Sequence, residues 1–337
     1  MTLPPERVVV RAPNWLGDVM LSLGALRDLR RAWPTAHLEV LALPRVAPIY
    51  DAVAEVDGVR TAATLPESVR ALRGSFDTAV VLPNSFRSAL EPFLAGVPQR
   101  WGHATDGRRL LLTRYTRPAP QVRGESEAFY YRSLVSGLGL PVAATPNLAI
   151  ACPEVWQTRA REMLEADGLW VGLNPGASFG AAKRWPPERF AAVAETAARD
   201  LGARIVILGS EPERLLAEEI AARIPSGPMV LAGRTSLPDL VGVISLLGAL
   251  VTNDSGPMHV AAALGVPVVA VFGPTDWRET APRSSAARVV REPVDCAPCK
   301  LRECPTDHRC MERVTSRRVF EALADQIAQR HQGGQQP

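Results

Sequence analysis

The segment 174–186, NPGASFGAAKRWP, combines small residues with two adjacent cationic side chains. Its glycines let backbone N–H groups approach an anion closely, and Lys183 and Arg184 supply positive charge. The only other lysine is Lys300, so Lys183 stands out in a chain whose basic residues are nearly all arginine. We interpret this segment as a cradle for a diphosphate, with a flexible surface connector as the alternative.

A second segment, 252–259, ends a predicted buried strand and opens a helix with Ser255 and Gly256. Helix N-termini present unpaired N–H groups that bind anions. Asp254 could accept hydrogen bonds from sugar hydroxyls beside a diphosphate, although helix capping alone also explains an aspartate here. We interpret His259 as a packing residue rather than a base.

Two further loops carry single carboxylates. Glu213 follows a predicted strand, where an acidic side chain can bind both hydroxyls of a ribose; the favourable charge at a helix N-terminus is the alternative. Asp18 follows the first predicted strand, in Asn-Trp-Leu-Gly-Asp, and is the candidate general base at a cleft between domains. Helix capping is the alternative for Asp18.

Parallel strands must position these loops. The first half opens with a β-branched strand at 8–10, a polar turn, and an apolar-periodic helix that ends near residue 33. Apolar runs at 38–43 and 78–82 alternate with helical patterns such as 85–95. This order predicts βαβ units on a parallel sheet.

The same rhythm restarts in the second half. Strands are predicted at 171–174, 204–208, 229–231, 249–252 and 266–272, and helices at 187–201, 211–224, 237–247, 258–264 and 316–329. The chain should therefore hold two doubly wound α/β domains, at 1–152 and 153–332, with a disordered tail at 333–337.

Composition excludes several classes of protein. The chain has 337 residues, of which 47% are hydrophobic and 22% charged, so it is neither disordered nor fibrous. Its net charge of +3 is too small for a general nucleic-acid binder, and no nucleic acid is expected as a partner. No apolar run is long enough to span a membrane and no signal peptide is evident, so a cytoplasmic protein is expected.

Four segments together carry a family resemblance. They are NWLGDVMLSLGALRDL, VLPNSFRSALEPFLAGVPQRWG, NPGASFGAAKRWP and VTNDSGPMHVAAALGVPVVAVFGPT, in this order along the chain. In combination they resemble the ADP-heptose:lipopolysaccharide heptosyltransferases of glycosyltransferase family 9. The resemblance implies a GT-B architecture, in which two Rossmann-like domains face each other across a cleft. The N-terminal domain would bind the acceptor and the C-terminal domain the ADP-heptose.

The resemblance also implies the reaction. L-glycero-D-manno-heptose would pass from ADP-heptose to heptosyl-Kdo2-lipid A, with inversion at the anomeric carbon, in the biosynthesis of the lipopolysaccharide inner core. No cofactor would be required for catalysis, because basic side chains and helix N-termini replace a metal cation on the diphosphate. Family members that add the first or third heptose, or that use another nucleotide sugar, are the alternatives.

Roles for individual residues follow from the same resemblance. Asp18 matches the family's proposed base. Lys183, with Ser178 nearby, matches the diphosphate contact, and Glu213 falls where the ribose-binding carboxylate is expected. Asp254 matches the carboxylate that contacts the heptose.

The remaining positions complete both sides of the implied site. Ser255 and Gly256 would present backbone N–H groups to the diphosphate. The N-terminal segment that matches the family's acceptor contacts consists of Asn84, Ser85 and Arg87.

A cysteine cluster lies near the C-terminus. Four of the five cysteines fall within fifteen residues, at Cys296, Cys299, Cys304 and Cys310. Four thiolates at this spacing, with His308 close by, can close a tetrahedral structural zinc site in a reducing cytosol. Disulfides, free thiols and an iron–sulfur cluster are the alternatives. Nothing in the spacing indicates catalysis.

An acceptor that carries lipid A implies peripheral contact with the cytosolic face of the inner membrane. Residues 1–150 hold 17 arginines against 13 acidic residues, an excess that could favour anionic lipid. Candidate contacts are Arg108, Arg109, Arg114 and Arg117, with solvated surface charge as the alternative. A non-catalytic binding module built around the cysteines is a competing function. It leaves unexplained Asp18 and the polar and charged residues in the loops that follow the predicted strands.

Overall fold

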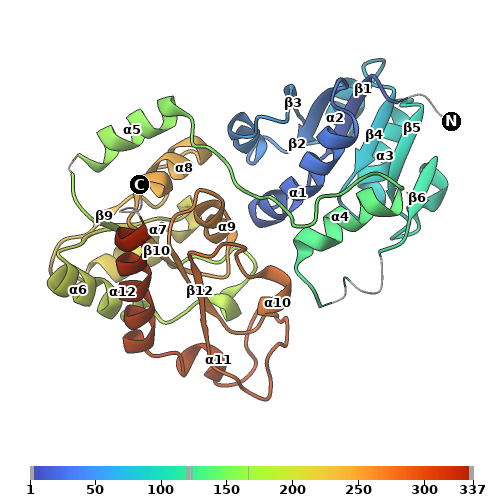
Figure 1. The fold of residues 1–337 in the computed structure, drawn as a ribbon. Coiled ribbons are helices and arrows are strands. Elements are labelled where there is room, and N and C mark those ends of the chain that lie inside the picture. The colour runs from blue at the N-terminus through green and yellow to red at the C-terminus, as the bar shows by residue number, and fades with distance from the viewer. Residues whose placement is uncertain (1–3, 119–121, 123, 166, 334–337) are drawn as a thin grey trace. The chain divides into compact units, whose positions relative to one another are not determined.

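The chain divides into two compact units, one ending at Ile150 and the other beginning at Ala151 (Figure 1). The structure is a computed structural model that describes residues 4–118, 122, 124–165 and 167–333, with side chains up to residue 330. Residues 334–337 of the predicted tail lie outside the described residues, whereas Gly333 ends the last helix.

The N-terminal unit is built on a six-stranded parallel sheet with the order β3-β2-β1-β4-β5-β6. Its strands are β1 (Arg7–Arg11), β2 (His37–Ala42), β3 (Gly58–Thr61), β4 (Thr78–Val81), β5 (Gln99–His103) and β6 (Arg114–Thr116). Consecutive valines in β1 are buried on both faces, as expected of a central parallel strand. The strand order reverses between β1 and β4, so a crevice opens beyond their carboxyl ends.

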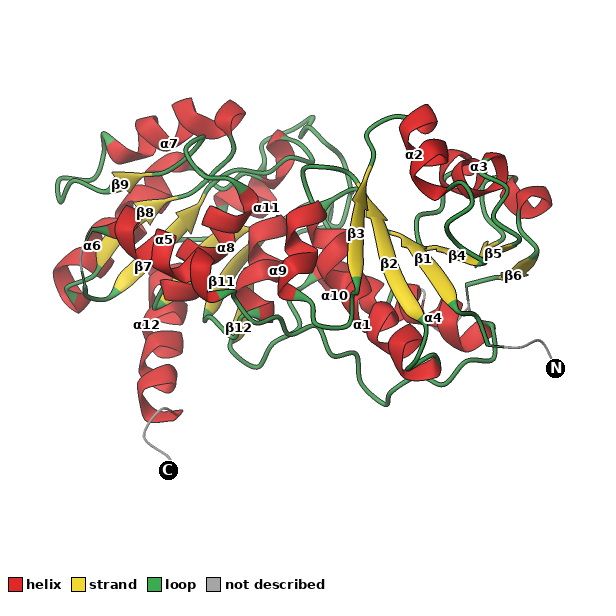
Figure 2. Cartoon of the chain, turned by 90° about the horizontal axis from the view of Figure 1, so that it is seen from above, coloured by secondary structure: helices red, strands yellow, loops and turns green. Residues whose placement is uncertain are grey.

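Helices cover both faces of this sheet (Figure 2). They are α1 (Leu16–Ala32), α2 (Leu65–Leu72), α3 (Phe86–Leu94) and α4 (Glu127–Gly137), with the 3₁₀ helices η1 (Ala47–Ala52) and η2 (Arg108–Leu111). Helix α1 packs against α4, and α2 packs against α3. Local sequence sets where the helices begin: Thr64 and Glu67 form a capping box before α2, and Ser85 caps α3.

The C-terminal unit repeats the architecture with the order β12-β11-β10-β7-β8-β9, again with parallel neighbours. Its strands are β7 (Trp170–Asn174), β8 (Arg204–Ile207), β9 (Met229–Val230), β10 (Ala249–Asn253), β11 (Val268–Phe272) and β12 (Ala287–Arg291). Here the order reverses between β7 and β10, which makes these two strands the neighbours whose loops bound the second crevice.

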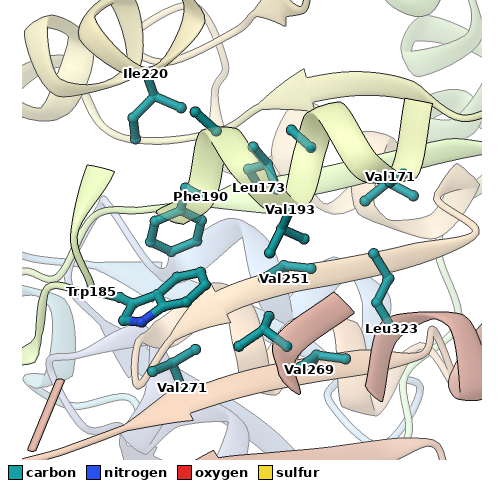
Figure 3. Packing of buried hydrophobic residues seen from close by; sticks show 14 of the residues in the cluster. Val171, Leu173, Trp185, Phe190, Val193, Ile220, Val251, Val269, Val271 and Leu323 are labelled. Atoms are coloured by element: carbon teal, nitrogen blue, oxygen red, sulfur yellow. The ribbon is translucent and has the colours of Figure 1, made fainter. Parts of the chain in front are cut away.

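The helices of this unit enclose its main core. They are α5 (Glu154–Leu164), α6 (Pro187–Leu201), α7 (Arg214–Ala221), α8 (Leu237–Leu246), α9 (Gly256–Ala263), α10 (Trp277–Thr280), α11 (Arg309–Glu312) and α12 (Ser316–Gly333), with the 3₁₀ helices η4 (Ala181–Lys183) and η5 (Glu211–Glu213). Trp185 meets Phe190 edge to face, with ring centroids 5.0 Å apart (Figure 3). The indole N–H of Trp185 donates to Val314 O (2.9 Å), so the C-terminal end of the segment 174–186 is anchored in the core.

Local sequence patterns do not predict every element of the fold. The predicted strands are present, but β3, β5, β6 and β12 were not predicted. These strands lie at or near the sheet edges. The residues of β3, β6 and β12 are mostly exposed or only partly buried, and β5 begins with two polar residues, so all four lack the apolar runs of central strands. The helix predicted at 211–224 begins instead as the 3₁₀ turn η5 and continues as α7.

Within the described part of the chain, no helix combines the length and apolarity needed to cross a membrane.

Candidate functional site

The carboxyl ends of β7 and β10 bring two of the predicted loops together. Asn174 Nδ2, at the end of β7, donates to Ser255 Oγ (3.0 Å). Asn253, at the end of β10, donates from Nδ2 to Pro175 O (2.7 Å) and accepts at Oδ1 from the backbone N–H of Trp185 (3.1 Å). Both ends of the segment 174–186 are therefore fastened to the same strand end, so the predicted phosphate loop is anchored rather than loose.

Lys183 and Asp254 form an ion pair at this junction. Lys183 Nζ lies 2.6 Å from Asp254 Oδ2, and the two side chains are only 11% and 5% exposed. Thr275 Oγ1 donates to the same carboxylate oxygen (2.6 Å), and the ammonium lies 4.9 Å from the ring centroid of Phe179. Because a buried cation without a partner is costly, these contacts fix the charge of Lys183 in one place.

His259 lies behind this pair and is buried, with 7% exposure. Burial lowers the pKa of His259 to about 4, and the charge of Lys183 adds to this shift while Asp254 opposes it. The imidazole is therefore neutral near pH 7, in agreement with a packing role.

Glu213 lies directly against the phosphate loop. Its Oε2 accepts hydrogen bonds from the backbone N–H (2.8 Å) and hydroxyl (2.7 Å) of Ser210, which closes the capping box of η5. A Cβ atom at Gly176 would lie 2.0 Å from Glu213 Oε1, so a larger residue here would require the Glu213 carboxylate to move. Ser178 is exposed on the same loop.

The start of α9 completes this side of the site. Helix α9 begins at Gly256 after Ser255, whose side chain makes no capping hydrogen bond within the described structure. The first-turn N–H groups of α9 thus face the edge where Lys183 and Glu213 lie. A fixed cation, a helix N-terminus and two carboxylates are the groups needed to hold a diphosphate and sugar hydroxyls.

Asp18 belongs to the N-terminal unit, where it is half-buried in the first turn of α1. The N-cap residue of α1 is Trp15, so Asp18 is not the helix cap. Its carboxylate lies close enough to Tyr131 of α4 for its charge to help raise the pKa of that phenol, which burial already raises. Asp18 thus lies at the carboxyl end of β1, near the strand-order reversal.

A cavity of about 400 Å³ lies at this crevice. It is lined by residues that include Arg11, Asn14, Arg45, Ser85, Arg87 and Glu91. At its buried wall, Arg11 Nε pairs with Glu91 Oε2 (2.6 Å). Arg45 and Arg87 are exposed at the cavity, so one carboxylate faces three guanidinium groups and the cavity is net positive.

The two exposed arginines are partly oriented by backbone oxygens. Arg45 Nη2 donates to Asn14 O (2.9 Å), and its guanidinium lies 5.0 Å from the Trp15 ring centroid. Arg87 Nη2 donates to Ala63 O (3.2 Å). Each guanidinium has further N–H groups beyond this bond, which suits the recognition of an anion.

Asn84 and Ser85 have local structural partners. Asn84 Oδ1 accepts from Tyr130 Oη (2.7 Å) and from Thr105 Oγ1 (3.3 Å). Ser85 Oγ accepts from the backbone N–H of Ser88 (3.3 Å) as the N-cap of α3. Of the predicted acceptor contacts, Arg87 and Ser85 line the cavity, whereas Asn84 supports the loop behind it.

The comparison with known proteins decides the family. The model of glycosyltransferase family 9 (heptosyltransferase) matches residues 67–309. The chain belongs to glycosyltransferase family 9. Lipopolysaccharide heptosyltransferase 2 of Escherichia coli K12 is 34% identical over 308 residues, which cover 85% of this chain and 88% of that protein. Lipooligosaccharide heptosyltransferase 2 of Haemophilus ducreyi is 31% identical, over 96% of this chain and 99% of its own.

A solved structure supports the same assignment. The E. coli ADP-heptose LPS heptosyltransferase II superposes with a TM-score of 0.84 at 31% identity, covering 96% of this chain and 99% of that one. The predicted fold class, with two Rossmann-like doubly wound units of the GT-B type, is confirmed. The predicted enzyme class, a glycosyltransferase of the heptosyltransferase family, is confirmed as well.

The cysteine cluster lies in the same unit as the Lys183 loop. Cys296 and Cys299 are exposed, Cys304 is half-buried, and Cys310 is buried; all are free thiols. Burial raises the pKa of Cys310 to about 11, and the nearby thiolates of the other three add to the shift. Among the described residues, no group of three or more His, Cys, Asp or Glu side chains is placed to hold a metal ion. Zinc therefore stays a prediction from spacing.

One predicted surface contact is wrong. Arg108 is 0% exposed in η2, and its Nε donates to His103 O (2.8 Å). Burial lowers the pKa of Arg108 to about 10. Arg109, Arg114 and Arg117 are exposed. The sequence of two adjacent arginines does not indicate which guanidinium is buried, because burial depends on carbonyl groups that the fold brings close from other parts of the chain.

Sequence reasoning also missed three side chains at the cavity of the N-terminal unit, namely Arg11, Arg45 and Glu91, and Thr275 beside Asp254 in the C-terminal unit. Arg11 ends β1, and Arg45 and Thr275 follow the ends of β2 and β11, so all three lie where ligands bind in doubly wound sheets. Their position after a strand was the available signal. Glu91 lies inside α3 and gave no comparable signal.

Proposed function

We propose that this protein is an inverting heptosyltransferase that moves L-glycero-D-manno-heptose from ADP-heptose to heptosyl-Kdo2-lipid A during lipopolysaccharide inner-core biosynthesis. The observation that carries the donor side is the buried Lys183–Asp254 pair, held at 2.6 Å between two loops of a family 9 chain. The names of its relatives, heptosyltransferase 2, support the acceptor.

In this reaction the donor diphosphate binds Lys183 and the N-terminus of α9, with Ser178, Ser255 and Gly256 contributing polar groups. Glu213 accepts hydrogen bonds from the ribose hydroxyls. When the diphosphate takes over Lys183, Asp254 becomes available to accept hydrogen bonds from the heptose. Thr275 keeps the carboxylate of Asp254 oriented through this exchange, since its hydroxyl bonds the same oxygen.

The transfer itself is a displacement at the anomeric carbon. The Asp18 carboxylate takes the proton of the acceptor hydroxyl as its oxygen forms the new C–O bond on the face opposite the diphosphate. The anomeric carbon–oxygen bond breaks, and ADP leaves with the electron pair. Lys183 stabilises the negative charge that develops on the departing diphosphate, so this chain's own side chains supply the charge that a metal would otherwise provide.

The acceptor side uses the cavity of the N-terminal unit. Its arginines, Arg45 and Arg87, are suited to the anionic groups of an inner-core acceptor, a sugar carboxylate or a phosphate. Ser85 lies at the same wall, and Asn84 holds the segment from behind. We further propose that exposed arginines such as Arg109, Arg114 and Arg117 support peripheral contact with the anionic inner membrane at its cytosolic face.

A transfer assay with purified protein tests this function. ADP-heptose is offered with either Kdo2-lipid A or its mono-heptosylated form, and product mass is the readout. Product from the mono-heptosylated acceptor alone is the expected result. Product from Kdo2-lipid A would instead assign addition of the first heptose, and absence of product from both would contradict the proposed donor–acceptor pair.

A further inference from the structure

The cysteine-rich loop, defined as residues 296–310, follows β12 and includes the start of α11 (Figure 1). It contacts the phosphate loop, the segment 174–186. The backbone N–H of Ala182 donates to Arg302 O (3.0 Å), and Ala182 O lies 2.7 Å from His308 Nε2. Because a carbonyl oxygen can only accept, Nε2 of His308 must carry the proton. Both backbone groups of the residue before Lys183 are thus held by this one loop.

Side chains reinforce the contact. The guanidinium of Arg302 lies 5.4 Å from the ring centroid of Phe179, and Lys183 Nζ lies 4.9 Å from the same centroid. A Cβ atom at Gly180 would lie 2.3 Å from Arg302 O, so glycine is required for the two loops to approach this closely.

The phosphate loop has little local structure of its own at this point. Only the three-residue turn η4 (Ala181–Lys183) precedes the chain's return to the core at Trp185. Short 3₁₀ turns have poor hydrogen-bond geometry and hold a side chain weakly by themselves. The position of the Lys183 backbone is therefore set largely by neighbours, and the cysteine-rich loop supplies two of them.

The far end of the cysteine-rich loop is fastened to the core. Cys310 and Met311 are buried, and a Cβ atom at Gly273 would lie 2.4 Å from Met311 Sδ and 3.0 Å from Cys310 Sγ. Gly273 follows β11 and precedes Thr275, which bonds Asp254. The loop thus joins the end of β11 to the turn that carries Lys183.

We propose that the cysteine-rich loop positions the donor site, with His308 and Arg302 acting as positioning residues for Lys183 through Ala182 and Phe179. The inference rests on the proposed function, because it takes Lys183 as the group that binds the diphosphate. It assigns the loop a role in donor affinity that does not depend on whether its thiols hold a metal.

Binding of ADP to the full-length protein, measured by isothermal titration, tests the proposal without an acceptor. Replacing His308 with Leu (His308→Leu) removes the donor to Ala182 O, and the loss of one positioning hydrogen bond should weaken ADP binding by about fivefold to tenfold. His308→Gln keeps an N–H at a similar reach and should restore binding to within about threefold. Both variants carry the same backbone cost at this left-handed residue.

Arg309→Ala is the matched control. The side chain of Arg309 is 42% exposed, and its Nε pairs with Asp307 Oδ1 (2.9 Å) within the same loop. Its ADP affinity should equal that of the wild type. Steady-state kinetics should show His308→Leu raising KM for ADP-heptose more than it raises KM for the acceptor.

The possible results distinguish an error in the proposed donor from an error in the positioning role of the loop. If wild-type protein fails to bind ADP, the proposed donor is wrong and the inference falls with it. If the wild type binds ADP and His308→Leu binds it equally well, only the positioning role is overturned. Loss of binding in both His308→Leu and His308→Gln, together with a lowered Tm, would also overturn it, because the histidine would then serve folding alone.

Discussion

The two units present the same sheet architecture but opposite kinds of site. In the C-terminal unit, Lys183 and Asp254 are 11% and 5% exposed and hold each other between two loops. In the N-terminal unit, the side chain of Arg87 is 57% exposed beside an open cavity. One site is assembled before any ligand arrives, whereas the other presents long side chains that are largely exposed to solvent.

This difference matches what each site would have to recognise under the proposed function. A diphosphate that leaves must be met by charge already in place, since groups that reorganise during the reaction stabilise the transition state less. An acceptor with several anionic groups can be bound by flexible arginines, at the cost of their side-chain entropy. The following variants test whether chemistry, donor binding and acceptor binding divide between the units in this way.

Asp18→Asn should have the largest effect, because it leaves the acceptor proton without a base. Turnover should fall by about 10²–10⁴-fold while ADP-heptose affinity stays unchanged. Transfer rates and ADP-heptose titration measure the two quantities. Asp51→Asn, an exposed carboxylate at the end of η1, is the control and should retain full activity. Near-normal turnover in Asp18→Asn would remove Asp18 from the role of base.

Lys183→Met should affect binding and turnover together. Loss of the cation should reduce kcat/KM by about 10²–10³-fold, because charge stabilisation of the leaving group is lost and Asp254 is left buried without its partner. Arg199→Met, which removes an exposed cation of α6, should change neither. A variant that lost only acceptor affinity would contradict the assignment of Lys183 to the donor.

Acid should destabilise both units through one buried histidine in each. Burial lowers the pKa of His103 and of His259 to about 4, below the value of about 6.5 expected in the unfolded chain. Between these values the unfolded state binds more protons, so stability present above pH 6.5 falls as the pH drops towards 4. The loss approaches about 3 kcal/mol per histidine.

Urea unfolding at pH 7 and pH 4.5 measures this dependence. His103→Gln and His259→Gln each remove one titrating group, so each variant should lose less stability than the wild type between the two pH values. A pH dependence equal to that of the wild type in either variant would show that its histidine is not buried in neutral form.

Arg45→Gln and Arg87→Gln should act on the acceptor side alone. We expect KM for the acceptor to rise by about tenfold in each, with ADP affinity intact, since each change removes a charge-assisted hydrogen bond. Arg70→Gln, at an exposed position near the end of α2, is the control. Acceptors that differ only in the presence of phosphate, with the same number of carboxylates, identify the anionic group that the arginines bind. An unchanged KM for every acceptor would refute the role of the cavity.

The zinc prediction concerns the C-terminal unit alone and carries the smallest expected effect on activity. Elemental analysis should find about one zinc per chain, held by Cys296, Cys299, Cys304 and Cys310. Its removal by a chelator should lower Tm, by about 2–4 °C for each kcal/mol that the metal contributes. Metal-free protein of unchanged stability would reject structural zinc.

Much of the fold could be read from local patterns. The valines of β1 and the apolar runs of β7, β10 and β11 predicted central strands because such strands are buried on both faces. The edge strands β6 and β12 left no such signal, since their partly exposed residues are selected less strongly for hydrophobicity.

The sequence by itself determined which residue types end the strands. Lys183, Asp254, Glu213 and Asp18 were all identified as candidates, because a loop after a parallel strand is where a ligand binds. Only the tertiary structure decided which of these groups touch. The Lys183–Asp254 pair joins residues 71 positions apart, and the Ala182–His308 contact joins residues 126 apart. Such contacts depend on the order of strands in the sheet and on glycines that allow two loops to approach closely. The local periodicity of apolar residues reveals neither of these.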